Sequence, residues 1–227
     1  LSSISQILYR QKKVEIHSIY LCPPEPNNLI TMNRNPDMEV EKEGMNAEDQ
    51  FFVQKESYTY EDAYELNGTK VIPIASLIEI IALVLGVILK ETDKMESSIQ
   101  SSFTAKSIPA ISVRDYLLRI AKNAHCSDEC FILGLIYIDR ITERNKAFII
   151  KSVNIHRLLI TGVMLAAKFF DDRYYNNEYW SRVGGITKKE INQLEIEFLN
   201  SINFDLYVDP IIFFRYRERL LSQVNIQ

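Results

Sequence analysis

The stretch from 154 to 172, NIHRLLITGVMLAAKFFDD, constrains this chain more than any other part of it. Eleven of the sixteen residues from 155 to 170 are apolar, so a helix here has almost no face suited to water. Asn154 is a favourable N-cap, because its side-chain oxygen can accept a hydrogen bond from an amide of the first turn. Gly162 is small enough to let a neighbouring helix approach closely. The stretch therefore predicts a central helix surrounded by others, on which the charge of Lys168 must reach an opening or a partner.

Composition narrows the class of protein. The 227 residues are 47% hydrophobic and 25% charged, as is usual for a globular protein. The formal net charge of -4 disfavours broad, sequence-independent binding to nucleic acid. Three cysteines, Cys22, Cys126 and Cys130, cannot all pair in internal disulfides, and no secretory signal opens the sequence. We therefore expect an intracellular location, nuclear and/or cytoplasmic.

The chain divides into four predicted parts. Residues 1–72 form an N-terminal extension that is partly flexible, residues 73–107 a flanking helix and loop, residues 108–208 a helical domain, and residues 209–227 a C-terminal helix. The composition of the extension is uneven. Residues 23–50 are rich in Pro, Asn and acids, as in a linker. Residues 51–64 carry five aromatic side chains, which either anchor the extension on the domain or bind a partner.

The apolar run over 74–90 requires a choice between a buried helix and a membrane span. Pro73 precedes the run and Glu79 interrupts it, and its length falls short of the ~20 residues that a bilayer needs. We expect a buried or partner-facing helix and no membrane insertion.

Five consecutive helices with short connections are predicted from about 112 to 203, and nothing in the chain is typical of a strand-rich domain. Thr187 and Glu190 have the spacing of a capping box at the start of the last of these helices. Gly184 and Gly185 end the preceding short helix, which starts at about residue 177. The predicted fold class is all-α.

An enzyme finds little support in the sequence. The three histidines are scattered, no Ser or Cys nucleophile has a defensible set of neighbours, and there is no glycine-rich phosphate loop. His125, Cys126 and Cys130 crowd one helix start and lack the second pair of ligands that a structural zinc site needs. We expect no catalytic residue, no metal, no cofactor and no small-molecule substrate.

Five sequence motifs resemble motifs of the cyclin family in their order and in the spacing between them. The resemblance covers residues 74–208. The five motifs are IPAISVRDYLLRI, CSDECFILGLIYIDRI, NIHRLLITGVMLAAKFFDD, YYNNEYWSRVGGI and LEIEFLNSINFDL. The resemblance is closest to the single-box P/U type of plants and protists and to the yeast phosphate-pathway cyclins. It implies a single cyclin box, a five-helix bundle around a central buried helix, with added flanking helices.

The resemblance also implies a binding site for a cyclin-dependent protein kinase. Family positions that bind the regulatory helix of the kinase match Lys168 and Glu195, and charge-assisted hydrogen bonds from such residues fix orientation as well as affinity. Asp172 matches an acid that can bind an arginine of the kinase. The alternative interpretation is that Asp172 is a solvated residue of a turn. The apolar positions of the groove match Phe169, Leu199, Phe204 and Leu206.

Asp139 is expected to be architectural, because a carboxylate on a mostly apolar helix needs a cation or several amides. In many cyclins its partner is an arginine whose place Ala110 takes here, so Arg119 or Arg157 is the predicted substitute.

The motif that docks substrates in mitotic cyclins is replaced here by PAISV, and Tyr116 occupies the position of the tryptophan of that docking site. Docking of RxL peptides is therefore not expected.

Taken together, the resemblance implies a regulatory subunit that binds and activates a cyclin-dependent serine/threonine kinase and has no catalysis of its own. The alternatives are an interaction module similar to the transcription factors that share the cyclin fold, and a helical scaffold that activates no kinase. The transcription factors use paired boxes and a basic surface, whereas this chain has one predicted box and a net negative charge. A scaffold would have no need of both Lys168 and Glu195.

Overall fold

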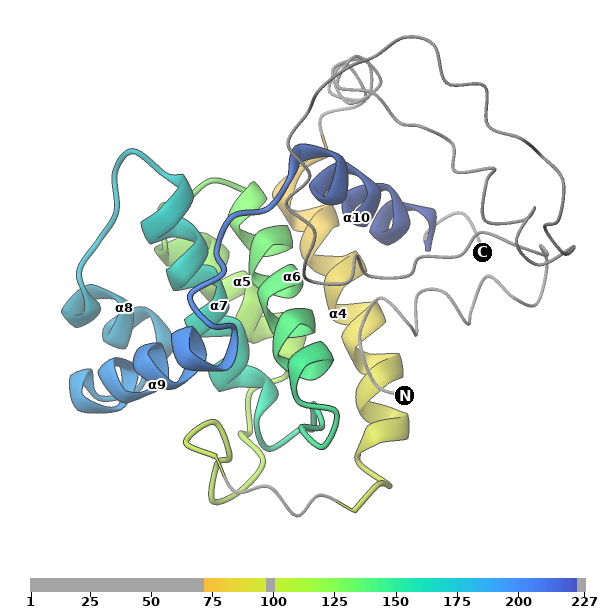
Figure 1. Ribbon diagram of the computed structural model, residues 1–227, viewed down its shortest axis with the longest axis vertical. Coiled ribbons are helices and arrows are strands. Elements are labelled where there is room, and N and C mark those ends of the chain that lie inside the picture. Colours follow the sequence, from red (N-terminus) through yellow and green to blue (C-terminus); the bar gives the residue numbers. More distant parts are fainter. Residues whose placement is uncertain (1–71, 97–100, 224–227) are drawn as a thin grey trace, which may run out of the picture.

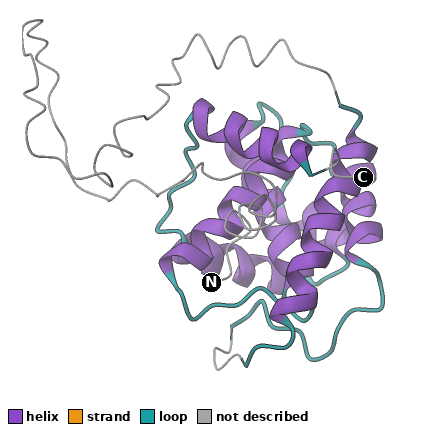
Figure 2. Ribbon diagram, turned by 90° about the vertical axis from the view of Figure 1, so that its right-hand side faces the viewer, coloured by secondary structure: helices purple, strands orange, loops and turns teal. Residues whose placement is uncertain are grey.

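The computed structural model describes residues 72–96 and 101–223, which contain seven helices and no strand. The helices run in chain order as α4 (Ile74–Thr92), α5 (Val113–Asn123), α6 (Glu129–Arg144), α7 (Ile155–Phe170), α8 (Asn177–Gly184), α9 (Lys188–Ser201) and α10 (Pro210–Ser222). Figure 2 shows these helices joined by loops. The predicted linker at 23–50 and the aromatic stretch at 51–64 lie outside the described residues. The all-α prediction is confirmed.

Helix α7 is the centre of the fold, as its apolar sequence predicts. It packs against α5, α6, α8 and α9 (Figure 1). Every residue from 155 to 167 is buried except Arg157, which is half-buried and forms an ion pair with Glu190 on α9. The buried polar side chains of α7 also form hydrogen bonds. His156 is within 2.9 Å of the main-chain oxygen of Ile111, and Thr161 donates to the oxygen of Arg157.

Helices α6 and α7 touch along their backbones where Gly134 meets Gly162. A Cβ atom added at Gly162 would lie 3.0 Å from the main-chain oxygen of Gly134, which is tighter than most Cβ contacts in proteins. This explains why the central helix carries glycine here, although glycine lowers helix propensity. The close approach predicted for Gly162 is confirmed.

Helices α4 and α10 flank the five central helices. The apolar side of α4 packs against α5 and α10, and its exposed side carries Leu83 and Gly86. Arg114 on α5 pairs with Glu79 on α4. Within residues 72–96 and 101–223, no helix is both long enough and apolar enough to cross a bilayer. The run predicted as a buried or partner-facing helix is thus mainly a packing element.

The helix ends test the capping predictions. The Thr187 hydroxyl accepts the Glu190 amide at 3.1 Å, and Gly185 ends α8 in the left-handed conformation with φ of +69°. The prediction for Asn154 is wrong in its mechanism. Asn154 does precede α7, but its side-chain oxygen accepts the amide of Lys151 and its nitrogen donates to Ile149. The side chain therefore fixes the turn before the helix, not the first turn of the helix itself.

Candidate functional site

The Lys168 ammonium and the Glu195 carboxylate form an ion pair between α7 and α9. Their Nζ and Oε1 atoms are 2.6 Å apart, and the two side chains are only 23% and 19% exposed. Lys168 lies in the last turn of α7, so it reaches the edge of the bundle from a buried helix. The structure thus brings together the two charged residues that the sequence resemblance singled out.

Asn177, at the start of α8, forms hydrogen bonds with both residues of this ion pair and so joins them in one network. Its side-chain nitrogen donates to Glu195 Oε2 at 2.6 Å and to Asn192 at 2.7 Å. Its side-chain oxygen accepts a hydrogen bond from Lys168. Sequence reasoning missed Asn177, although the word YYNNEYW that contains it was part of the resemblance. A side-chain amide can serve a lysine and a glutamate together because it is both donor and acceptor.

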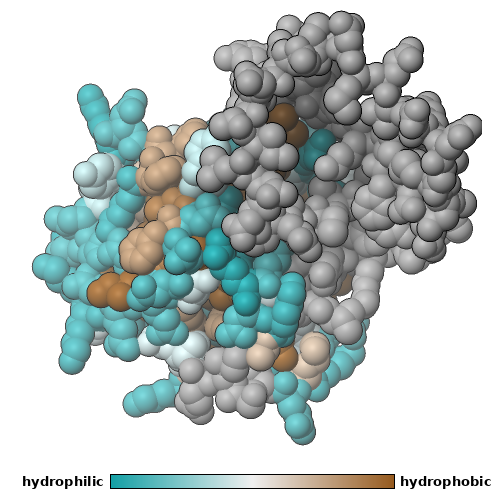
Figure 3. Space-filling model, viewed as in Figure 1, coloured by the Kyte–Doolittle hydropathy of each residue, from teal (hydrophilic) through white to brown (hydrophobic). Residues whose placement is uncertain are grey.

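Large apolar side chains are exposed close to this network in sequence. Phe169 follows Lys168 and is 54% exposed, and Phe204, beyond the end of α9, is 64% exposed. Leu199 and Leu206 are half-buried and pack against the core. Figure 3 shows apolar residues gathered over the end of α7 and the neighbouring part of α9, with hydrophilic residues around them. Of the four predicted apolar residues, two are exposed and two are half-buried.

Four further large apolar residues between residues 169 and 207, beyond the predicted set, are more than half exposed. They are Phe170, Tyr174, Ile196 and Tyr207. Sequence patterns alone gave no reason to single out these four residues as exposed. We call the eight residues Phe169, Phe170, Tyr174, Ile196, Leu199, Phe204, Leu206 and Tyr207 the apolar patch.

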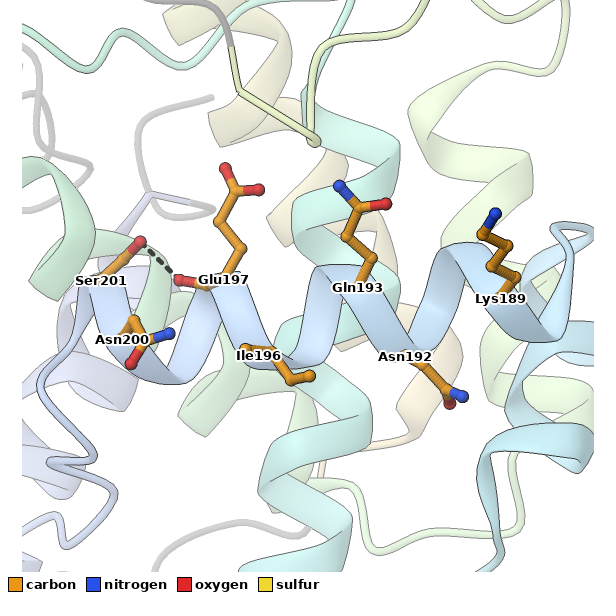
Figure 4. Close-up of a pocket in the computed structure, with 7 residues that line it drawn as sticks. All are labelled: Lys189, Asn192, Gln193, Ile196, Glu197, Asn200 and Ser201. Carbon is orange, nitrogen blue, oxygen red and sulfur yellow. Dashed lines mark hydrogen bonds between the residues drawn. The ribbon is translucent and has the colours of Figure 1, made fainter.

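The outer side of α9 carries a shallow groove. Figure 4 shows its lining, which comes from α9 alone: Lys189, Asn192, Gln193, Ile196, Glu197, Asn200 and Ser201. The Glu197 carboxylate accepts the amide of Ser102, and Gln193 donates to the Ser102 hydroxyl, so the loop before α5 is tied to this helix. A groove built by one helix does not enclose a small ligand, whereas small-molecule sites usually do.

The two acids after α7 have different surroundings. Asp171 accepts hydrogen bonds from the main-chain nitrogen and the hydroxyl of Ser127, just before α6. Its negative charge therefore lies near the positive end of the α6 dipole, which is stabilising. Asp172 is exposed on the loop between α7 and α8.

Asp139 is buried on α6, but its surroundings differ from the prediction. Its carboxylate accepts a hydrogen bond of 3.1 Å from the hydroxyl of Tyr216 on α10. Burial and this carboxylate raise the pKa of Tyr216. Arg119 instead donates to the main-chain oxygen of Arg182, and Arg157 pairs with Glu190. The predicted pairing with either arginine is wrong, because those guanidinium groups serve α8 and α9.

The residues weighed as a metal site are spread between surface and core. His125 is exposed with φ of +50°, and its ring lies 6.2 Å from that of Tyr175. Cys130 is buried and donates to Asp171; its neighbour Cys126 and burial raise the pKa of the Cys130 thiol. No group of three or more His, Cys, Asp or Glu side chains in the described ranges could hold a metal ion.

Comparison with known proteins gives a consistent set of relatives. A family model described as Cyclin matches residues 27–206, so the match begins inside the predicted extension. Cyclin-U4-1 of Arabidopsis thaliana is 48% identical over 126 residues, which cover 56% of this chain and 62% of that protein. Cyclin-U3-1 of the same plant is 52% identical over 108 residues, 48% of each chain. Cyclin-P4-1 of Oryza sativa subsp. japonica is 46% identical over 130 residues, 57% of this chain and 61% of that protein. The chain thus spans between 48% and 62% of the length of these relatives.

Proposed function

The chain belongs to the cyclin family, and from this premise we propose that it binds a cyclin-dependent serine/threonine protein kinase and activates it. In this proposal the chain is a non-catalytic regulatory subunit, and the phosphoryl transfer is performed by the kinase. The family and its P/U-type relatives support the class of partner. The site on this chain must be argued from its own residues.

The observation that carries the proposal is the Lys168–Glu195 network beside the apolar patch. Lysine and glutamate held near the edge of an apolar surface offer a donor and an acceptor to the backbone of an approaching helix. Phe169 and Phe204 are exposed aromatic side chains of the kind that dominates interface energy. This combination of apolar anchors and a few oriented charges suits a protein partner better than a small molecule.

Activation would follow from a population shift in the kinase. Binding energy gained only when the regulatory helix is turned inward favours the conformation in which the catalytic ion pair of the kinase forms. The exposed carboxylate of Asp172 is available to an arginine of the partner, in the role that the resemblance implies. Differential contact between the two kinase conformations is what the chain must supply.

A charge exchange tests the site without dismantling the local structure. The double variant Lys168→Glu, Glu195→Lys keeps an ion pair at the same place but presents both charges reversed to a partner. We expect the native chain to retain a kinase with associated activity from cell extract, and the double variant to retain none. Mass spectrometry and a protein-kinase assay of the retained material give the readout.

A matched exchange provides the control. Lys188 and Glu178 form an exposed ion pair between α9 and α8, with atoms 3.3 Å apart. Exchanging these two residues should leave kinase retention unchanged. Equal retention by the Lys168/Glu195 variant would contradict the proposed site. If the native chain retained no kinase, the proposed function itself would fail, and a scaffold without kinase activation would become the better hypothesis.

A further inference from the structure

The segment after α9 belongs to neither a helix nor a strand. Residues 203–208 connect α9 to α10 in Figure 1, and they contribute Phe204, Leu206 and Tyr207 to the apolar patch. Phe204 and Tyr207 are more than 60% exposed. Exposed aromatic side chains on such a segment would be expected to move, unless something outside the segment fixes its backbone.

The backbone at the start of this segment is in an unfavourable conformation. Asn203 has φ of +54° and Phe204 has φ of +58°. Asparagine tolerates the left-handed region, but a bulky aromatic residue there is a genuine outlier. Such a conformation persists only where surrounding contacts impose it, and outliers of this kind cluster at functional surfaces.

Main-chain hydrogen bonds to the last turn of α9 hold these two residues, since their amides donate to the oxygens of Asn200 and Leu199. The carbonyl groups that follow them are bound from α6. The hydroxyl of Tyr137 donates to the main-chain oxygen of Leu206 at 2.8 Å. The guanidinium of Arg140 donates to the main-chain oxygen of Tyr207 at 2.7 Å and also to that of Asp205. Tyr137 and Arg140 thus bind three successive carbonyl groups, and the Arg140 side chain is only 15% exposed. Arg144 differs, since it reaches only the Asp205 carboxylate, at 3.2 Å.

We propose that Tyr137 and Arg140 form a clamp that positions the segment 204–207 as a rigid part of the kinase-binding surface. The inference rests on the proposed function, because it assigns a role within that surface. A flexible segment would lose conformational entropy on binding, which weakens affinity, whereas a segment already fixed avoids that loss. Tyr137 and Arg140 are positioning residues: they touch the backbone behind the patch and present its side chains to the partner.

A purely structural role is the competing explanation, and two readouts separate it from positioning. The first is hydrogen exchange of the amides of residues 204–207 in the isolated chain, which reports the clamp without any partner. The second is the affinity for the kinase subunit that the native chain retains from extract, measured with purified components. The thermal unfolding midpoint shows whether the fold as a whole has changed.

Three variants remove different numbers of the hydrogen-bond donors that Tyr137 and Arg140 supply. Arg140→Met keeps the apolar stem and removes every donor, Arg140→Lys keeps the charge but loses the fork, and Tyr137→Phe removes one hydroxyl. We expect exchange to be faster and kinase affinity weaker by about tenfold in Arg140→Met, with smaller changes in the other two. Arg144→Gln, one helical turn further on, removes only a contact to the Asp205 side chain and should change both quantities less than Arg140→Met does.

Each result supports or overturns the inference. Faster exchange in the Arg140 variants together with weaker binding, at an unchanged unfolding midpoint, supports it. Unchanged exchange overturns the clamp. Faster exchange with unchanged kinase affinity, while the Lys168/Glu195 exchange still abolishes binding, overturns the positioning role but leaves the proposed function standing. A native chain that binds no kinase overturns both.

Discussion

His156 is a buried histidine whose charge the folded chain accommodates poorly. Its Nε2 atom lies 2.9 Å from the Ile111 carbonyl, so that nitrogen carries the hydrogen, and Nδ1 has no hydrogen-bond partner in the described structure. An added proton would have to be placed on Nδ1, without an acceptor. Burial is the main cause that lowers the pKa of His156 below its ordinary value.

This environment predicts a loss of stability in mild acid. Below about pH 6.5 the unfolded chain takes up a proton at this histidine that the folded chain does not, so the free energy of unfolding falls as pH falls. The contribution has a limit of about 1.4 kcal/mol per pH unit. Urea unfolding between pH 7 and 5.5 should show a shallower pH dependence in His156→Gln. The exposed His125→Gln is the control and should follow the native chain.

Asn177 and Asn176 are neighbours for which the same substitution should have different effects. In Asn177→Asp the nitrogen that donates to Glu195 becomes a carboxylate oxygen, so two negative charges meet at a partly buried site. We expect the free energy of unfolding to fall by about 1–2 kcal/mol. Asn176 caps α8 through its side-chain oxygen, a role that aspartate fills equally well. Asn176→Asp should therefore be near neutral in urea unfolding, and equal effects at both positions would count against the network.

At the scale of elements, the crossing of α6 and α7 depends on Gly162. An alanine Cβ there would press on the backbone of Gly134, which neither helix can easily move. We expect Gly162→Ala to lower the free energy of unfolding by about 1 kcal/mol, since overpacking outweighs the gain in helix propensity. Gly86→Ala on α4 is the matched test, because its Cβ would meet nothing within 4 Å. That substitution should raise stability by about 0.5–1 kcal/mol, so the two variants differ in sign in thermal unfolding.

Sequence patterns predicted the helices and their ends better than they predicted which side chains contact each other between helices. The apolar density of α7, the Thr187 cap and the glycine stop of α8 follow from local rules, and the structure confirms each. The surroundings of Asn154 and Asp139 depend on which distant groups the fold brings near, and those predictions were wrong in part. Tyr216, for example, lies 77 positions beyond Asp139 in the chain. No periodicity of either helix could have paired them.

At the scale of the whole molecule, the candidate site joins three separate parts of the chain. The end of α7, the start of α8 and the length of α9 supply Lys168, Asn177 and Glu195. The resemblance pointed to Lys168 and Glu195, because both occupy positions that match motifs of the family. It could not point to the contacts of Tyr137 and Arg140, whose acceptors are main-chain carbonyls that every residue possesses. Such contacts depend on tertiary geometry alone.

The ion pair between Lys168 and Glu195 also bears on how a partner arrives. Two opposite charges 2.6 Å apart form a local dipole with no net charge, so their combined field fades quickly with distance in salt water. Neither residue can therefore draw a partner from afar. The first encounter depends on diffusion and on the fit of surfaces, and the discrimination made by this pair is expressed in how long the complex lasts after contact.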